Sequence, residues 1–229
     1  MNIETLNLTT SRGPTTAHVA RPDTEATAGI ILIQEWWGLN DHIRDVAGRY
    51  ANEGYLCVAP DLYRGRVAAD PQEAAAFMNA LTIDDGMETI RQAIAAAHEK
   101  YGVQKFGING FCMGGTYSLR AACEIPSLGA AAPFYGDVPE EVVLAKLSVP
   151  TLFIAGTRDA WINPAKVNGL KEMARKYNLP VEAVSYEADH AFFNDTRPQV
   201  YDAEAAADAW QRVLAHFEKY LLHQAARSA

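Results

Sequence analysis

Short runs of consecutive apolar residues recur along the 229-residue chain, separated by longer stretches of mixed polarity. Such runs, rich in Val, Ile and Leu, are typical of strands buried on both faces of a sheet. The continuous runs cover residues 29–33, 55–59, 103–108, 128–134 and 151–155. A sixth segment, 181–186, alternates between apolar and polar residues and also predicts a strand.

The stretches between these runs have helical character. Asp84 is a predicted N-cap for the stretch 85–101, and Asn163-Pro164 would begin the stretch 165–177 with a cap and a first-turn proline. Strands that alternate with helices predict a mostly parallel sheet with helices on both faces. The helix-like stretches cover residues 41–53, 71–81, 85–101, 117–123, 165–177 and 200–222.

The first twenty residues have a different pattern. Residues 3–8 and 15–20 alternate loosely, and the segment Ser11-Arg12-Gly13-Pro14 between them favours a turn, so we expect an edge hairpin. No linker rich in Pro, Gly or Ser divides the chain, and no internal repeat is visible. The expected organisation is therefore a single α/β domain over residues 1–229.

Composition narrows the classes of function. The net charge is −8 and no run of Lys or Arg occurs, which argues against binding to nucleic acid. No apolar run approaches the roughly 20 residues of a membrane span, and the first residues lack the pattern of a secretory signal. Three cysteines without C-x-x-C spacing and six scattered histidines disfavour a metal site and favour free thiols in a reducing cytoplasm.

The segment Gly110-Phe111-Cys112-Met113-Gly114-Gly115 carries the clearest chemical signal. It joins an apolar run to a helix-like stretch, which is the layout of a nucleophile elbow with Cys in place of Ser. Glycines suit this strained turn because neighbouring backbones pack closely there. A cysteine at a helix N-terminus is also favoured as thiolate. Cys57 and Cys123 lie within apolar segments and are expected to be buried.

A cysteine nucleophile needs a base and an acid. In this architecture the expected chain order is nucleophile, acid, histidine. Asp159 follows the run 151–155, and His190 follows the strand 181–186. Asp189 and Asp195 are alternative acids, but neither follows an apolar strand.

The proposed roles follow from the chemistry of each group. The thiolate of Cys112 would attack an acyl carbon, His190 would hold the thiol proton and later activate water, and Asp159 would orient the imidazole. The backbone N–H of Met113, directly after the nucleophile, would bind the oxyanion. A second N–H is expected from the loop after the strand 29–33.

Five segments carry a further signal: Gly110–Gly115, Gln34–Asn40, Pro60–Tyr63, Phe134–Gly136 and Asp189–Phe192. Together they resemble the dienelactone hydrolase (carboxymethylenebutenolidase) family over nearly the whole chain. The Cys elbow and the segment that contains Glu35 are the more specific of them. The resemblance implies an α/β-hydrolase fold, a triad of Cys112, Asp159 and His190, and hydrolysis of an enol-lactone without metal or organic cofactor.

The resemblance also implies roles outside the triad. Glu35 would interact with the resting thiol and help to generate thiolate when it moves away, because a nearby carboxylate raises the pKa of a thiol. The N–H of Trp36 would be the second oxyanion donor, with the Trp36 ring as a wall of the site. Trp37, Phe111 and Tyr135 are further candidates for contact with substrate.

One departure from the family concerns the substrate. The family holds its substrate carboxylate with arginines, one of them four residues beyond the catalytic histidine, and here that position is Asn194. Arg197 is a possible substitute, and Arg64 and Arg66 are candidates for the family's other arginine. Losing a bidentate partner would weaken the binding of anionic substrates.

We therefore expect a hydrolase of small esters or lactones, with dienelactone as the leading substrate and neutral esters as the alternative. A thiol-transfer protein is disfavoured because C-x-x-C spacing is absent. A non-catalytic ligand-binding module of the same fold is disfavoured because all three triad candidates are present. Neither a nucleic acid nor a membrane is an expected partner, and the sequence does not indicate an oligomeric state.

Overall fold

The computed structural model describes residues 1–222, in which the chain forms two compact units. The first unit covers Met1–Gly107, and the second begins at Ile108. The boundary lies within a strand, not in a linker. The single domain expected over residues 1–229 stays a prediction.

Four strands form the sheet of the first unit, in the order β1-β2-β4-β3. Strands β1 (Asn2–Thr10) and β2 (Gly13–Arg21) form the predicted hairpin, paired antiparallel from Asn2 opposite Arg21 to Thr10 opposite Gly13. Strand β4 (Leu56–Pro60) runs antiparallel to β2 and parallel to β3 (Gly29–Ile33). Every residue of β3 and β4 is buried, as their apolar runs predict.

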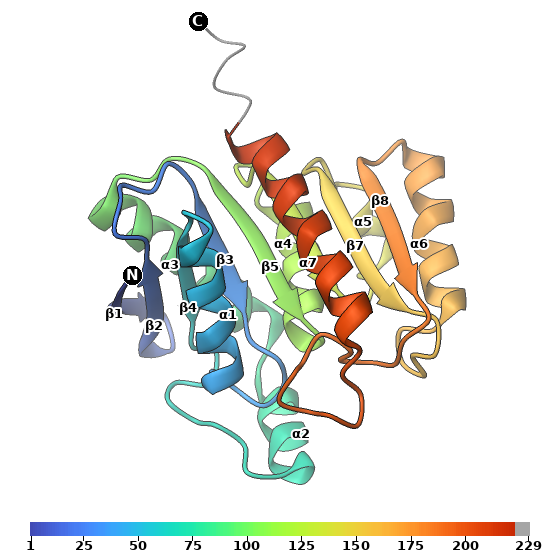
Figure 1. Cartoon of the computed structure of the whole chain (residues 1–229), viewed down its shortest axis with the longest axis horizontal. Coiled ribbons are helices and arrows are strands. Elements are labelled where there is room, and N and C mark those ends of the chain that lie inside the picture. Colours follow the sequence, from blue (N-terminus) through green and yellow to red (C-terminus); the bar gives the residue numbers. More distant parts are fainter. Residues whose placement is uncertain (223–229) are drawn as a thin grey trace, which may run out of the picture. The chain divides into compact units, whose positions relative to one another are not determined.

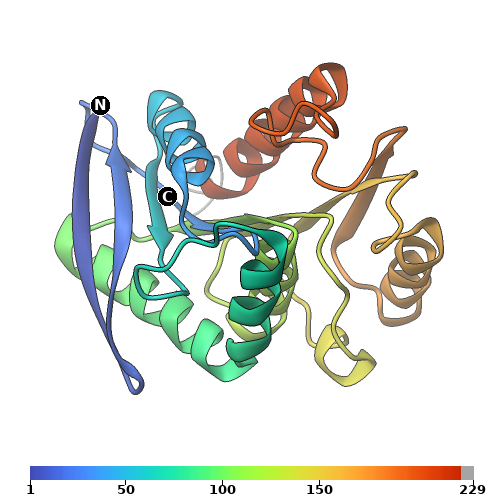
Figure 2. The same cartoon turned by 90° about the horizontal axis from the view of Figure 1, so that it is seen from below.

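Three helices belong to the first unit: α1 (Asp41–Asn52), α2 (Pro71–Ala80) and α3 (Ile83–Tyr101). Helices α1 and α3 pack on the strands from opposite sides (Figure 2). The predicted cap of α3 is wrong by two residues. Thr82, not Asp84, is the N-cap, and its hydroxyl accepts a hydrogen bond from the N–H of Asp85 at 3.3 Å, because Ile83 already has helical geometry.

The second unit contains a parallel array of strands in the order β5-β6-β7-β8. Figure 1 shows helix α7 in front of these strands and α4 behind them. The strands are β5 (Phe106–Phe111, beginning in the first unit), β6 (Ala130–Phe134), β7 (Thr151–Gly156) and β8 (Val181–Tyr186). The helices are α4 (Met113–Glu124), α5 (Glu141–Leu144), α6 (Pro164–Tyr177) and α7 (Ala203–Phe217), and α7 continues into a π-helical turn, Glu218–Leu222.

The sequence pattern predicts most of these elements. Asn163 caps α6 as expected, since its side chain accepts a hydrogen bond from the N–H of Lys166 at 3.1 Å. The strand expected at 103–108 lies at Phe106–Phe111. The apolar run ends at Ile108, but the strand continues through Asn109 and Gly110, which are also buried in the sheet. Within residues 1–222 no helix is long and apolar enough to cross a membrane.

Candidate active site

Cys112 lies between the end of β5 and the first residue of α4. Its backbone has φ +56° and ψ −115°, a region that L-residues other than glycine rarely occupy. Cys112 forms no disulfide bond within residues 1–222 and is partly exposed. A strained backbone at a strand-to-helix turn is the geometry expected of a nucleophile elbow.

Close backbone contacts hold this turn. A Cβ atom on Gly110 would collide with the carbonyl of Gly114, and one on Gly115 would collide with the carbonyl of Phe134. The N–H of Cys112 donates to the same Phe134 carbonyl at 3.1 Å. Gly110 is therefore required because the end of β5 packs against the first turn of α4, and Gly115 because that turn packs against the end of β6.

Asp159 and His190 follow neighbouring strands, β7 and β8, and the structure brings them together. Nδ1 of His190 lies 2.6 Å from Oδ2 of Asp159. The other oxygen, Oδ1, accepts hydrogen bonds from the N–H groups of Trp161 at 2.7 Å and Ile162 at 2.9 Å. The Asp159 side chain has no exposed area. Asp159, not the alternative Asp189 or Asp195, is thus the carboxylate that binds Nδ1 of this histidine; its role as the catalytic acid stays a prediction.

Two opposing effects act on the pKa of Asp159. Burial raises it, but the hydrogen bond and charge of His190, together with the two backbone N–H groups, outweigh burial and lower the pKa below its usual value. The carboxylate is therefore ionised at neutral pH. An ionised Asp159 keeps a proton on Nδ1 of His190, which leaves Nε2 as the basic nitrogen of the neutral ring.

Nε2 is the ring nitrogen of His190 that does not bind Asp159. It is buried and makes no hydrogen bond within residues 1–222. The imidazole contacts two aromatic rings, those of Tyr135 and Trp161, with centroid distances of 5.0 and 5.2 Å. Tyr135 follows directly after Phe134, whose carbonyl binds the N–H of Cys112. The elbow is therefore hydrogen-bonded to Phe134, and the ring of the next residue, Tyr135, contacts the imidazole.

The sequence patterns do not predict the position of Trp161 beside His190. Trp161 is 56% exposed, and its ring meets that of His190 edge to face. The available signal is its position two residues after Asp159, but an isolated tryptophan in a loop has no pattern that distinguishes such a contact from ordinary packing.

The loops that carry the acid and the histidine are joined by backbone hydrogen bonds. The N–H of Thr157 donates to the Tyr186 carbonyl at 2.8 Å, and that of Arg158 donates to the Ala188 carbonyl at 3.1 Å. Gly156 ends β7 so close to this second loop that a Cβ atom on it would collide with the carbonyl of Ala188. The position of His190 thus depends on the absence of a side chain at residue 156.

The remaining candidates of the second unit have defined surroundings. Met113 is the first residue of α4, so its N–H belongs to the turn whose amides find no acceptor inside the helix. Phe111 is buried and stacks on Phe193 with centroids 5.0 Å apart. Asn194 is buried too, and its Oδ1 accepts hydrogen bonds from the N–H and hydroxyl of Thr196 at 3.0 and 2.6 Å. Their roles toward substrate stay predictions.

Glu35, Trp36 and Trp37 lie in the first unit, in the loop after β3. Glu35 is buried, and its carbonyl accepts a hydrogen bond from the N–H of Gly38 at 3.2 Å. The two indole rings meet edge to face with centroids 5.1 Å apart. Their expected roles, as partner of the thiol, oxyanion donor and contact with substrate, stay predictions.

The two arginine candidates, also in the first unit, differ in how strongly they are held. Arg64 binds both carboxylate oxygens of the buried Asp85, at 2.8 and 3.2 Å, and donates to the Thr10 hydroxyl at 2.9 Å. Nε of Arg66 donates to the Tyr63 carbonyl at 3.2 Å, and its guanidinium lies 4.3 Å from the ring centre of Phe77. Arg64 therefore already has a bidentate carboxylate partner within the protein.

No group of three or more His, Cys, Asp or Glu side chains within the described residues is arranged to hold a metal ion. The expectation that no cofactor takes part is a separate prediction and does not follow from this.

Known proteins provide the comparison for this fold and site. The crystal structure of a "Putative Dienelactone Hydrolase" from Klebsiella pneumoniae subsp. pneumoniae matches 96% of this chain and 100% of its own, with a TM-score of 0.86 and 32% identity. The chain accordingly has the α/β-hydrolase fold, and its class is that of a hydrolase acting on ester bonds. The model of the dienelactone hydrolase family matches residues 15–221, so the chain belongs to that family.

Two relatives agree with this assignment. "Protein usf" of Aquifex pyrophilus is 34% identical over 206 residues, which cover 84% of this chain and 88% of the relative. A "Putative carboxymethylenebutenolidase" of Aquifex aeolicus is 30% identical over 217 residues, covering 89% of this chain and 93% of the relative. Membership of an enzyme family disfavours the non-catalytic module considered above.

The exposure of the three thiols predicts selective alkylation. Burial raises the pKa of Cys123 to about 12 and that of Cys57 well above its usual range, whereas Cys112 is partly exposed. We expect brief treatment of the folded protein with iodoacetamide to modify Cys112 alone, as peptide mass spectrometry would measure. Equal labelling of Cys123 in the folded state would contradict this assignment.

The close approach at Gly156 predicts a displaced histidine in Gly156→Ala. The new methyl group must push the Ala188 carbonyl away, so the His190–Asp159 hydrogen bond should lengthen. Proton NMR at low temperature would follow the Nδ1 proton, which a short charge-assisted bond moves far downfield. The matched control is Gly169→Ala on α6, where a Cβ atom meets nothing within 4 Å. An unchanged Nδ1 resonance in Gly156→Ala would refute the argument.

Proposed function

We propose that this chain hydrolyses enol-lactones such as dienelactone through an acyl-enzyme on Cys112, with His190 as the base and Asp159 as its orienting acid. The main support is the hydrogen bond between Nδ1 of His190 and the buried Asp159, which leaves a buried Nε2 without a partner in the described residues. The strained elbow at Cys112 is the second support. The N–H of Cys112 binds the carbonyl of Phe134, and the next residue, Tyr135, contacts the His190 ring.

The first half of the reaction forms a thioester. The thiol proton of Cys112 passes to Nε2 of His190, and the sulfur attacks the lactone carbonyl carbon. The carbonyl electrons move onto oxygen, where the N–H groups of Met113 and Trp36 would bind the oxyanion. Collapse of this intermediate breaks the ring C–O bond, and the departing enol oxygen takes the proton from Nε2.

The second half releases the acid. His190 removes a proton from water, and the resulting hydroxide attacks the thioester carbon. The C–S bond breaks, the sulfur recovers its proton from Nε2, and the carboxylic acid leaves. Asp159 stabilises the imidazolium in both halves, because its depressed pKa keeps it ionised. Glu35 would interact with the thiol in the resting enzyme and withdraw when substrate binds.

A second candidate is hydrolysis of neutral esters or lactones. Two observations favour it: the guanidinium of Arg64 is held by Asp85, and Asn194 occupies the position where the family has an arginine. A site with fewer arginines available loses affinity for a substrate carboxylate but keeps the acyl chemistry. A small ester or lactone is the proposed partner in either case, and a cytoplasmic location stays a prediction.

Substitutions in the triad test the mechanism. We expect Cys112→Ala to abolish hydrolysis of nitrophenyl acetate while the protein stays folded. Asp159→Asn should lower kcat by about 10³-fold or more, because the imidazole loses its tautomer and orientation. The matched control is Cys123→Ala, a second thiol on α4 whose Sγ donates to its own helix at Leu119, and it should keep full activity. Full activity in Cys112→Ala would eliminate the thiol mechanism.

Substitutions of the arginines test the substrate. If the enzyme binds dienelactone through Arg66, Arg66→Gln should lower kcat/KM for dienelactone about tenfold and leave nitrophenyl acetate unchanged. Arg64→Met should instead destabilise the fold by about 2–4 kcal/mol, measured by urea denaturation, because it leaves the buried carboxylate of Asp85 without its main partner. An unchanged ratio of the two substrates in Arg66→Gln would favour the neutral-ester candidate.

A further inference from the structure

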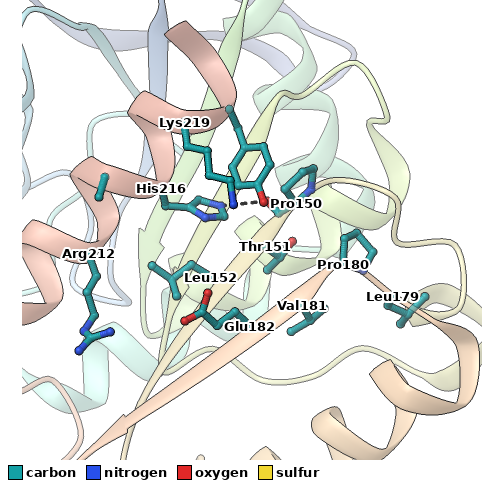
Figure 3. A pocket seen from close by; sticks show the side chains of 12 residues that line it. Pro150, Thr151, Leu152, Leu179, Pro180, Val181, Glu182, Arg212, His216 and Lys219 are labelled. Carbon is teal, nitrogen blue, oxygen red and sulfur yellow. Dashed lines mark hydrogen bonds between the residues drawn. The ribbon is translucent and has the colours of Figure 1, made fainter. Parts of the chain in front are cut away.

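A cavity of about 450 Å³ lies in the second unit, at the amino ends of β7 and β8 (Figure 3). It begins where Thr151 and Val181 open the two strands, whereas Asp159 and His190 follow their carboxyl ends. A strand of six residues spans roughly 20 Å, so the cavity is well separated from the His190–Asp159 pair. Its size is typical of a small-molecule site.

Two surfaces of different character line the cavity. One is apolar and comes from the start of the strands and the turns before them: Pro150, Leu152, Leu179, Pro180 and Val181. The other comes from the end of α7 and its π-helical extension: Arg212, Ala215, His216, Lys219 and Tyr220. Helical residues spaced by three and four share one face, and Figure 3 shows Arg212, His216 and Lys219 along the same side of this helix.

Two opposite charges face this cavity without being neutralised. Nζ of Lys219 lies 4.8 Å from the ring centre of Tyr220 but forms no ion pair with any carboxylate within residues 1–222. Glu182 on β8 also forms no ion pair in that part of the chain, and its carboxylate is a lining group (Figure 3). Arg212 differs from both, because Asp208 holds its Nε at 2.7 Å.

His216 does not add a third charge. Its Nε2 donates to the Pro150 carbonyl at 3.1 Å. Burial is the largest influence on its pKa and lowers it. The facing Glu182 raises that pKa and the facing Lys219 lowers it, so the ring is neutral at pH 7. Among the residues that the structure describes, the cavity therefore presents one cation and one anion without an ion-pair partner, together with an apolar surface.

We propose that this cavity binds a small zwitterion with an apolar body, the chemical class of the apolar amino acids. The ligand carboxylate would pair with Lys219, its ammonium with Glu182, and its side chain would pack on Leu152 and Val181. A simple carboxylate would meet repulsion from Glu182, and a simple amine would meet repulsion from Lys219. The proposal is independent of the chemistry assigned to Cys112.

Three probes of one shape test this assignment by isothermal titration calorimetry on the full chain. L-Phenylalanine carries both charges, 3-phenylpropionate lacks the ammonium, and phenethylamine lacks the carboxylate. We expect phenylalanine to bind at least about tenfold more tightly than either analogue. Absence of binding up to about 10 mM phenylalanine would overturn the proposal.

Variants then locate the bound molecule. Lys219→Gln and Glu182→Gln should each weaken phenylalanine binding at least about fivefold, and Glu182→Gln should narrow its advantage over 3-phenylpropionate. The matched controls, Lys146→Gln and Glu172→Gln, change exposed residues outside the cavity and should leave binding unchanged.

Two further experiments test whether phenylalanine binds in this cavity and not at Cys112. Ala215→Phe fills the cavity from an exposed helix position and should abolish binding with the fold intact, as circular dichroism would verify. Retained binding in this variant would overturn the proposal. Loss of binding after alkylation of Cys112 would also overturn it, because the molecule would then occupy the proposed active site.

Discussion

The hydrogen bond between His190 and the buried carboxylate of Asp159 is the interaction on which the proposed chemistry depends. A buried carboxylate is costly unless its oxygens are satisfied, and here three N–H groups satisfy them, two from the backbone and one from the imidazole. The two backbone donors belong to the loop of Asp159 itself, so the acid keeps its orientation independently of the histidine. The imidazole then has one fixed nitrogen and one nitrogen left for chemistry.

Backbone strain is concentrated around the same group. Outside glycine, five described residues have φ in the left-handed region, and three of them, Cys112, Tyr135 and Ala191, are near the proposed triad. Each such residue costs about 1–3 kcal/mol and persists only where its surroundings enforce it. The enforcement is visible in the glycines: Gly115 and Gly136 approach so closely that neither tolerates a Cβ atom. Tight packing between the first turn of α4 and the residues that follow β6 therefore maintains a geometry that the local sequence alone would relax.

Much of this could be predicted from the sequence because local patterns encode it. The apolar runs predict the strands, and the glycine frame of Cys112 predicts the elbow. Other features are not encoded in local patterns. The sequence does not predict helix α5, because its four residues are too few for a periodic pattern. Arg64 looks like a solvated loop charge until the fold brings Asp85 to it from 21 residues away. The contact of Trp161 with His190 likewise depends on the pairing of β7 with β8, which no local pattern records.

Because β7 and β8 are parallel, their carboxyl ends carry the His190–Asp159 pair and their amino ends line the zwitterion cavity. Parallel strands place all their carboxyl ends at one edge, so side chains distant in sequence, such as Asp159 and His190, meet there. The amino ends meet at the opposite edge, beside His216 at the end of α7 and Lys219 in its π-helical extension. The register that aligns Thr151 with Val181 also aligns Gly156 with Tyr186, so one set of ladder hydrogen bonds positions both edges. A substitution that shifts this register would therefore disturb the His190–Asp159 pair and the zwitterion cavity together, whereas changes on the helix face affect the cavity alone.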